Sequence, residues 1–204
     1  MKHGIKKTAF AFLVLAAIGL TAQQAGTLKG TPPGPMPFYV YLDYGNMKNH
    51  YIPSGYMGDF GDIQINNNIR KNTKAGTSCL RLTYSGKALQ GQQWAGVYWQ
   101  NPANNWGGKQ GGYDLSTAKK LTFWARGQKG GETVEFKMGG IKGKYADTGT
   151  ETSGTVNLTK EWKQFSISLE DVLATYISGG FCAVFTKAAN PDGCVFYLDE
   201  IRYE

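Results

Sequence analysis

Short runs in which apolar and polar residues alternate recur along the chain, and this alternation is typical of β-strands. In residues 120–126, Leu121 and Phe123 point to one side while Trp124 and Arg126 point to the other. Turn-forming residues separate ten such runs: 38–43, 62–65, 78–84, 94–100, 120–126, 132–138, 154–158, 163–169, 180–186 and 194–203. Even spacing without alternating helices predicts an all-β, antiparallel two-sheet sandwich, with one helical turn in residues 169–177.

The run 132–138 alternates in the same way and leaves Glu135 and Lys137 on the side opposite its apolar residues. If the runs 120–126 and 132–138 pair as neighbouring strands, Trp124 and Arg126 share an outer face with Glu135 and Lys137. An indole beside hydrogen-bonding charges suits a sugar, which stacks through its axial hydrogens and bonds through its hydroxyls. The alternative interpretation is a solvated sheet face with an incidental tryptophan.

A second aromatic segment lies in residues 94–106, WAGVYWQNPANNW. Tyr98 and Gln100 share one face of the predicted strand with Trp94, and Trp106 closes the amide-rich loop that follows. Such a loop is a candidate rim for a ligand, although asparagine also serves turn geometry alone. The sequence therefore predicts a ligand contact by Tyr98, Gln100 and Trp106, and it leaves open whether a sheet face or this loop rim holds the ligand.

Residues 1–22 have the pattern of a secretion signal. Lys2, Lys6 and Lys7 precede an apolar stretch of twelve residues, 9–20, and Thr21-Ala22 offers a cleavage site. That stretch is too short to span a bilayer as a helix, so no membrane span is expected. The predicted organisation is a signal peptide at 1–22, a Pro/Gly-rich linker at 23–37 and one domain at 38–204, and the expected location is secreted, periplasmic or extracellular.

The net charge of the chain falls once the predicted signal is removed. Lys and Arg fall from 22 to 19 against 15 acids, so the net charge falls from +7 to +4. The sequence shows no clustered basic stripe, and phosphate binding requires one. Nucleic acid is therefore not an expected partner.

Three cysteines, Cys79, Cys182 and Cys194, allow at most one disulfide. Folding a hairpin between the last two strands places Cys182 and Cys194 out of register, so a direct bridge needs a different register. Buried unpaired thiols and a bridge from Cys79 to one of the other two are the remaining interpretations.

Three segments, YDLSTAKKLTFWARG, EWKQFSISLED and FYLDEIRYE, carry a resemblance to a known family. Their order and spacing resemble landmarks of the galactose-binding-like jelly-roll superfamily, the fold of many carbohydrate-binding modules attached to secreted polysaccharide-degrading enzymes. The resemblance covers residues 38–204. It implies a jelly roll, a polysaccharide or oligosaccharide ligand, and other secreted glycan-processing proteins as partners.

The resemblance also implies a structural Ca²⁺ ion between the first and last strands, with Asp43 and Asp199 as ligands. Calcium needs six to eight converging oxygens, and carbonyls of the loop 71–77 are the further candidates. The alternative is that both carboxylates only accept turn or strand hydrogen bonds.

Two other function classes compete with a binding protein. A jelly-roll glycosidase or polysaccharide lyase normally needs two carboxyl groups facing one cleft, and only Glu135 is a good candidate. His50 is the one histidine outside the signal, and no GxSxG or HExxH motif is present. A structural or adhesive envelope protein would share the fold and the secretion signal, and no sequence motif distinguishes it from a binding protein. We interpret the sequence as a secreted, non-catalytic carbohydrate-binding protein, with these two classes as alternatives.

Overall fold

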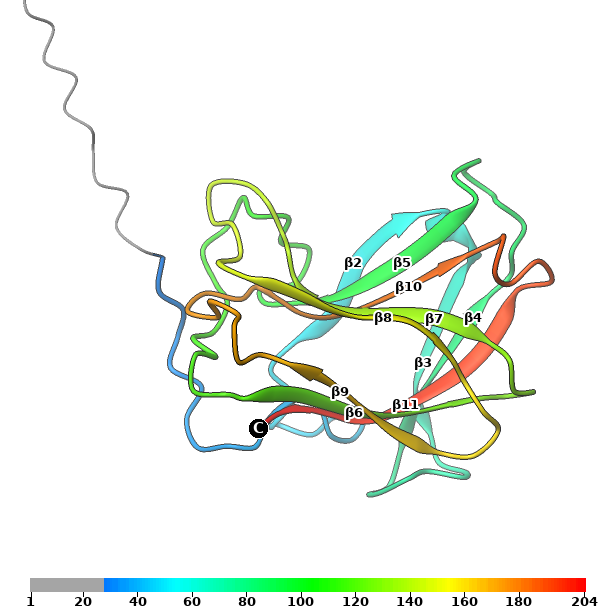
Figure 1. Cartoon of the computed structure of the whole chain (residues 1–204), viewed down its shortest axis with the longest axis horizontal. Coiled ribbons are helices and arrows are strands. Elements are labelled where there is room, and N and C mark those ends of the chain that lie inside the picture. Colours follow the sequence, from blue (N-terminus) through cyan, green and yellow to red (C-terminus); the bar gives the residue numbers. More distant parts are fainter. Residues whose placement is uncertain (1–27) are drawn as a thin grey trace, which may run out of the picture.

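The computed structural model describes residues 28–204, which form a sandwich of two sheets (Figure 1). Its strands are β1 (Phe38–Tyr41), β2 (Ile52–Gly58), β3 (Ile63–Ile69), β4 (Cys79–Tyr84), β5 (Trp94–Gln100), β6 (Lys120–Gly127), β7 (Thr133–Gly139), β8 (Thr150–Asn157), β9 (Lys163–Ser168), β10 (Gly179–Thr186) and β11 (Cys194–Tyr203). The one helical element of the described residues is a 3₁₀ turn, Phe60–Asp62.

The two sheets are named here after their central strands. The β11 sheet has the order β3-β4-β11-β6-β9, and β1 pairs with the end of β11 that β4 leaves free. The β10 sheet has the order β2-β5-β10-β7-β8. All strand pairs are antiparallel, which confirms the predicted all-β jelly-roll sandwich.

Each of the ten predicted runs overlaps an observed strand, and β2 is the strand that the pattern missed. Its sequence, IPSGYMG, carries a proline and two glycines, which weaken a strand. β2 tolerates them because it is an edge strand that pairs only with β5, with a bulge between Pro53 and Gly55.

The helical turn predicted in residues 169–177 is wrong. One local turn bond forms, from the N–H of Val172 to the carbonyl of Leu169, but no helix follows it. Later carbonyls of the segment bond to other parts of the chain: the N–H of Leu115 donates to Ala174, and the N–H of Thr148 donates to Tyr176. The hydrophobic pattern is short enough to fit either element, and these long-range partners decide it.

The N-terminal segment joins the domain earlier than the predicted boundary at residue 38. Thr31 forms a bridge with Tyr113, the N–H of Gly30 donates to the carbonyl of Thr175 at 2.8 Å, and Met36 packs against the core. The part of the predicted linker that the structure describes is therefore attached to the sandwich. The predicted signal, 1–22, lies outside the described residues and stays a prediction.

Aromatic side chains fill the space between the sheets. Phe123 of β6 meets Phe136 of β7 with ring centroids 4.6 Å apart, and Phe181 of β10 lies 5.1 Å and 5.6 Å from these two rings. All three are fully buried. β6 and β7 belong to different sheets and face each other across this core. The runs 120–126 and 132–138 therefore do not pair, and the condition for one shared outer face is not met.

The same topology shows whether the three cysteines form a disulfide. Cys79, Cys182 and Cys194 are all free and buried, and the strands that carry Cys182 and Cys194 belong to opposite sheets. Burial raises the pKa of the Cys79 thiol to about 11, with a smaller contribution from the negative charge of Asp199. The thiols are therefore protonated at neutral pH and behave as small core residues.

No helix within residues 28–204 is long and apolar enough to cross a membrane.

Replacing Phe181 by alanine should lower the free energy of unfolding by about 3–5 kcal/mol, because it empties a site where three aromatic rings meet. Urea denaturation followed by tryptophan fluorescence measures the change. Phe60, whose side chain is 54% exposed, is the matched control, and Phe60→Ala should change the stability by no more than about 0.5 kcal/mol. Equal losses in both variants would contradict the described core.

Candidate functional site

The sandwich divides the predicted ligand residues between its two outer surfaces. Glu135 and Lys137 lie on the outer surface of the β10 sheet, together with Tyr98 and the loop that carries Trp106. Trp124 and Arg126 lie on the opposite side, on the outer surface of the β11 sheet. We call these surfaces the β10 face and the β11 face.

Small residues lie between larger side chains in the middle of the β10 face, which we call its floor. Strand register places Gly55, Tyr98, Cys182, Lys137 and Thr152 in one row across the five strands. The next row contains Gly96, which packs so closely against neighbouring side chains that an added Cβ would lie 2.9 Å from a methionine methyl. The side chains of Met57 and Val184 cover Gly96, and Cys182 is 0% exposed, so neighbouring side chains close over these small residues.

Tyr98 and Trp106 stand at one end of this floor. Trp106 is 47% exposed, and its ring lies edge-on to Tyr98 with centroids 6.1 Å apart and an interplanar angle of 88°. The Tyr98 hydroxyl donates to the carbonyl of Gly139 at 2.9 Å. Burial raises the pKa of the Tyr98 hydroxyl. The bond to Gly139 holds the ring in its orientation.

The loop that carries Trp106 is held by Gln100. Its amide Nε2 donates to the carbonyl of Asn105 at 2.9 Å, and its Oε1 accepts from the Ser54 hydroxyl at 3.0 Å. Gln100 is 0% exposed. The predicted direct contact between Gln100 and a ligand is therefore wrong, because this side chain is used to position the Trp106 loop.

A charged pair lies further along the floor. The Glu135 Oε1 lies 3.3 Å from the Lys137 Nζ and accepts from the Thr152 hydroxyl at 2.8 Å. Both charged side chains are about one-third exposed. A carboxylate that accepts and an ammonium that donates give neighbouring sugar hydroxyls partners of both kinds.

Asp147 positions the same end of the face and was not predicted. Its carboxylate accepts hydrogen bonds from the N–H and hydroxyl of Ser178 at 2.6 and 2.7 Å, and from the N–H groups of Ile141 and Gly179. Burial raises its pKa despite these bonds. Asp147 ties the β7–β8 loop to the start of β10 beside Tyr98. Its sequence signal is that of any turn aspartate, so the pattern could not single it out.

The β11 face carries aromatic rings that are already partnered by cations. Lys74 Nζ lies 4.0 Å from the centre of the Trp124 ring, and the Arg126 guanidinium lies 3.9 Å from the Tyr197 ring and 5.3 Å from the Trp162 ring. Tyr197 and Trp162 were not predicted as site residues. Trp124 therefore has a lysine over its ring where the sequence predicted an open stacking platform.

Asp43 and Asp199, the predicted calcium ligands, both bind the loop between β3 and β4. Asp43 Oδ1 accepts from the backbone N–H groups and hydroxyls of Thr77 and Ser78, and Asp199 Oδ2 accepts from the N–H groups of Lys74 and Ala75. N–H and O–H donors converge on both carboxylates, whereas Ca²⁺ needs converging oxygen acceptors.

The residues as arranged do not fit a calcium ion. Within residues 28–204 no group of three or more His, Cys, Asp and Glu side chains is placed to hold a metal. The two carboxylates instead fasten the β3–β4 loop over the β11 face. Calcium at this position stays a prediction from the resemblance.

The fold and the aromatic β10 face define a class, the β-sandwich carbohydrate-binding modules. The chain belongs to the carbohydrate binding domain 30 family, whose model matches residues 43–204. No curated protein matches the chain.

Solved structures give the same fold. Two crystal structures of family 30 carbohydrate-binding modules superpose with TM-scores of 0.56 and 0.55, at 16% and 17% identity, covering 84% and 83% of this chain and 88% and 99% of theirs. The family 30 module of the cellulosomal cellulase Cel9D-Cel44B of Clostridium thermocellum has a TM-score of 0.53 and 18% identity, with 83% and 98% covered.

Replacing Asp43 by alanine should lower the free energy of unfolding by about 2–3 kcal/mol, because four donors lose a charged acceptor. Thermal melts with EDTA and with Ca²⁺ measure this loss. We expect the same loss in both media. A loss present only with Ca²⁺, together with a lower melting temperature of the unmodified protein in EDTA, would establish a calcium site instead.

Proposed function

We propose that this chain is a non-catalytic polysaccharide-binding protein and that its β10 face holds a neutral glycan, with Tyr98 and Trp106 as the stacking residues. One observation carries the proposal. An exposed indole and a fixed tyrosine ring stand on the same sheet face as the partly exposed Glu135–Lys137 pair.

A glycan fits this arrangement for two reasons. The apolar side of a pyranose ring stacks on an aromatic ring, and the indole of Trp106 is the most exposed ring beside the floor. The hydroxyls at the rim of the same sugar need hydrogen-bond donors and acceptors. Lys137 and Glu135, in adjacent rows of the sheet, supply one of each. The ion pair is partly exposed, so it can exchange water for hydroxyls at low cost.

Binding without cleavage agrees with the state of the acidic and basic groups. Glu135 is paired with Lys137, whereas glycoside hydrolysis uses two carboxyl groups on either side of the scissile bond. The His50 ring stacks on Phe38 at 4.0 Å, and its Nδ1 lies 3.0 Å from the carbonyl of Tyr39. It is therefore part of the domain's packing and is not free to act on a ligand on the β10 face.

The predicted signal peptide supports a role outside the cytoplasm, where polysaccharides are met. A binding module delivered there acts by holding a protein at a glycan surface. Other secreted glycan-processing proteins are the partners that this role suggests.

Trp106→Ala and Tyr98→Ala should each weaken binding to a soluble neutral polysaccharide by about 1–3 kcal/mol, equal to about 5- to 150-fold in Kd. Isothermal titration calorimetry against mixed-linkage β-glucan, xyloglucan and glucomannan measures the change. Tyr98→Phe keeps the ring and should stay within about threefold of the unmodified protein. Phe60→Ala, an exposed aromatic outside the face, is the matched control. Unchanged affinity of Trp106→Ala and Tyr98→Ala would refute the site.

Incubation of the protein with the polysaccharide that it binds should release no reducing ends above the buffer control. The Glu135→Gln variant gives the second comparison. Reducing ends that increase in proportion to the added protein, and that disappear in Glu135→Gln, would show that the face is catalytic.

A further inference from the structure

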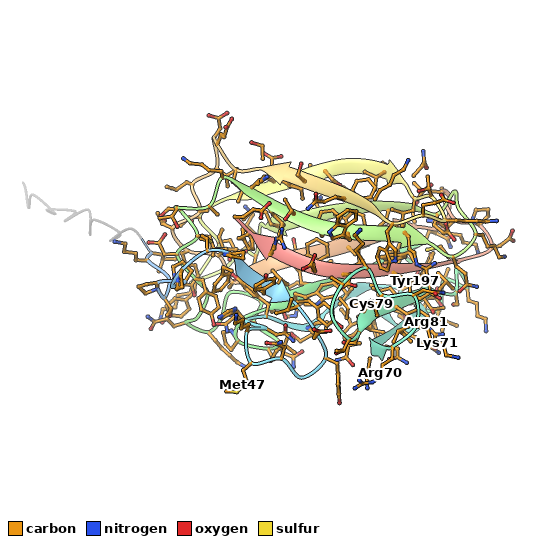
Figure 2. The ribbon with its side chains drawn as sticks, turned by 90° about the horizontal axis from the view of Figure 1, so that it is seen from below. Met47, Arg70, Lys71, Cys79, Arg81 and Tyr197 are labelled. Carbon is orange, nitrogen blue, oxygen red and sulfur yellow. The ribbon has the colours of Figure 1, made fainter. Side chains whose placement is uncertain are left out.

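A row of alternating cationic and aromatic side chains crosses the β11 face. Strand register places Arg81 of β4 opposite Tyr197 of β11, and Tyr197 opposite Arg126 of β6. Lys163 at the start of β9 pairs with Ala125, so the preceding residue, Trp162, lies opposite Arg126. The order across the sheet is therefore Arg81, Tyr197, Arg126, Trp162. Figure 2 looks onto this side of the molecule and shows Tyr197 and Arg81 close together.

Further positive charges extend this row. Arg70 and Lys71 lie in the connection that follows β3, the strand that pairs with β4, and Lys74 lies over Trp124 in the adjacent row. In the part of the chain that the structure describes, none of these five cations forms an ion pair, because the ion pairs found there involve Lys120, Lys137 and Arg202.

One negative charge beside the row is withdrawn from solvent. Asp199 lies on the same side of the sheet, opposite Trp124, but it is 0% exposed and bonded to the N–H groups of Lys74 and Ala75. The loop that covers Asp199 is the loop that brings Lys74 onto the face. Glu161, which precedes Trp162, is exposed, so the charge around the row is positive on balance, from Arg81, Arg126 and Lys74.

Arg126 occupies the centre of the row and is held in place by its aromatic neighbours. Its guanidinium lies over the rings of Tyr197 and Trp162, and its buried Nε has no hydrogen-bond partner among the described residues. The guanidinium is fixed by stacking, and its Nη1 donates to the carbonyl of Gly127 at 3.4 Å. Because the Nε is buried, an acceptor from outside the protein would bind the Nη donors.

We infer that the β11 face is a second binding site, separate from the β10 face, and that its ligand is a carboxylate-bearing polysaccharide, a polyuronate. Arg81 and Arg126 each bind one carboxylate. Because Arg126 lies over the rings of Tyr197 and Trp162, the sugar units between the carboxylates contact the edges of these rings and do not stack on their faces. The inference depends on the β11 face alone and does not require the site proposed on the β10 face.

The spacing of the arginines agrees with this ligand. One strand separates β4 from β6, and neighbouring strands lie about 4.8 Å apart, so Arg81 and Arg126 start about 10 Å apart. Carboxylates on alternate residues of an extended 1,4-linked pyranose chain recur at a similar interval. The planar fork of each guanidinium matches a carboxylate with two hydrogen bonds.

Single-stranded nucleic acid is the other polyanion that an Arg and aromatic surface suggests. Its bases need open ring faces for stacking. Arg126 and Lys74 already lie over the rings of Tyr197, Trp162 and Trp124. The face therefore favours a polyuronate, whose carboxylates bind the guanidiniums and whose sugar units do not need to stack as flat bases do.

The test titrates the full chain with de-esterified polygalacturonate and with its fully methyl-esterified form at equal ionic strength. We expect the de-esterified polymer to bind at least about tenfold more tightly, since esterification removes the charge that the guanidiniums recognise. Arg81→Gln should weaken binding to polygalacturonate by about tenfold or more and leave binding to the neutral glucan unchanged.

Two matched variants separate the second site from bulk charge and from the first site. Lys163→Gln removes one positive charge from the inner side of β9, outside the row, and should leave polygalacturonate binding within about twofold. Trp106→Ala should likewise leave it unchanged. If Trp106→Ala abolishes polygalacturonate binding, both ligands use the β10 face and the second site does not exist.

Other outcomes would also overturn the inference. Equal binding of the esterified and de-esterified polymers, equal losses in Arg81→Gln and Lys163→Gln, or no binding of polygalacturonate would each do so. Equally tight binding of single-stranded DNA of matched charge would show a general polyanion surface. Loss of neutral glucan binding in Trp106→Ala, with polygalacturonate binding retained, supports both sites. The proposal for either site can be refuted without refuting the other.

Discussion

The packing of Phe123 of β6 against Phe136 of β7 is the contact on which the arrangement of this protein depends. Side chains alternate along a strand, so burying these two rings against each other turns Trp124 and Arg126 to one outer surface and Glu135 and Lys137 to the other. The rings of Phe181 and Trp99 complete the layer, with centroids 5.3 Å apart. The core thus fixes which chemical groups share a face, and it does so before any loop is placed.

Buried and half-buried polar side chains set the loops that border each face. Gln100 holds the Trp106 loop from beneath, and Asp147 ties the β7–β8 loop to β10 beside Tyr98. On the other surface, Asp43 and Asp199 fasten the β3–β4 loop and with it Lys74. The three aspartates accept hydrogen bonds from backbone N–H groups, whereas Gln100 donates to a loop carbonyl. In each case a polar side chain satisfies loop backbone groups, which is the usual requirement for ordered irregular structure.

The alternation of apolar residues was sufficient to predict the strands and the sandwich, because each strand buries one side. It was not sufficient to predict strand order, since sequence neighbours such as β6 and β7 lie in different sheets. The candidate site was therefore predicted residue by residue but combined wrongly. Trp162 and Tyr197 were missed because their role depends on Arg126 lying between them across the sheet, a relation between strands that are distant in the sequence. Gln100 was misassigned because an outward-pointing residue is buried when a loop folds over it.

The central claim is that neutral glycan binds the β10 face, and a ¹H–¹⁵N NMR titration of the unmodified protein with a neutral β-glucan oligosaccharide tests it most directly. Trp106 and Trp162 report the two opposite faces through their separate indole N–H signals. The account predicts that the Trp106 indole and the amides of Tyr98 and Lys137 shift with increasing ligand, while the Trp162 indole, which donates to the carbonyl of Asn72 at 2.9 Å, does not. A shift of the Trp162 indole with Trp106 unmoved would contradict the account.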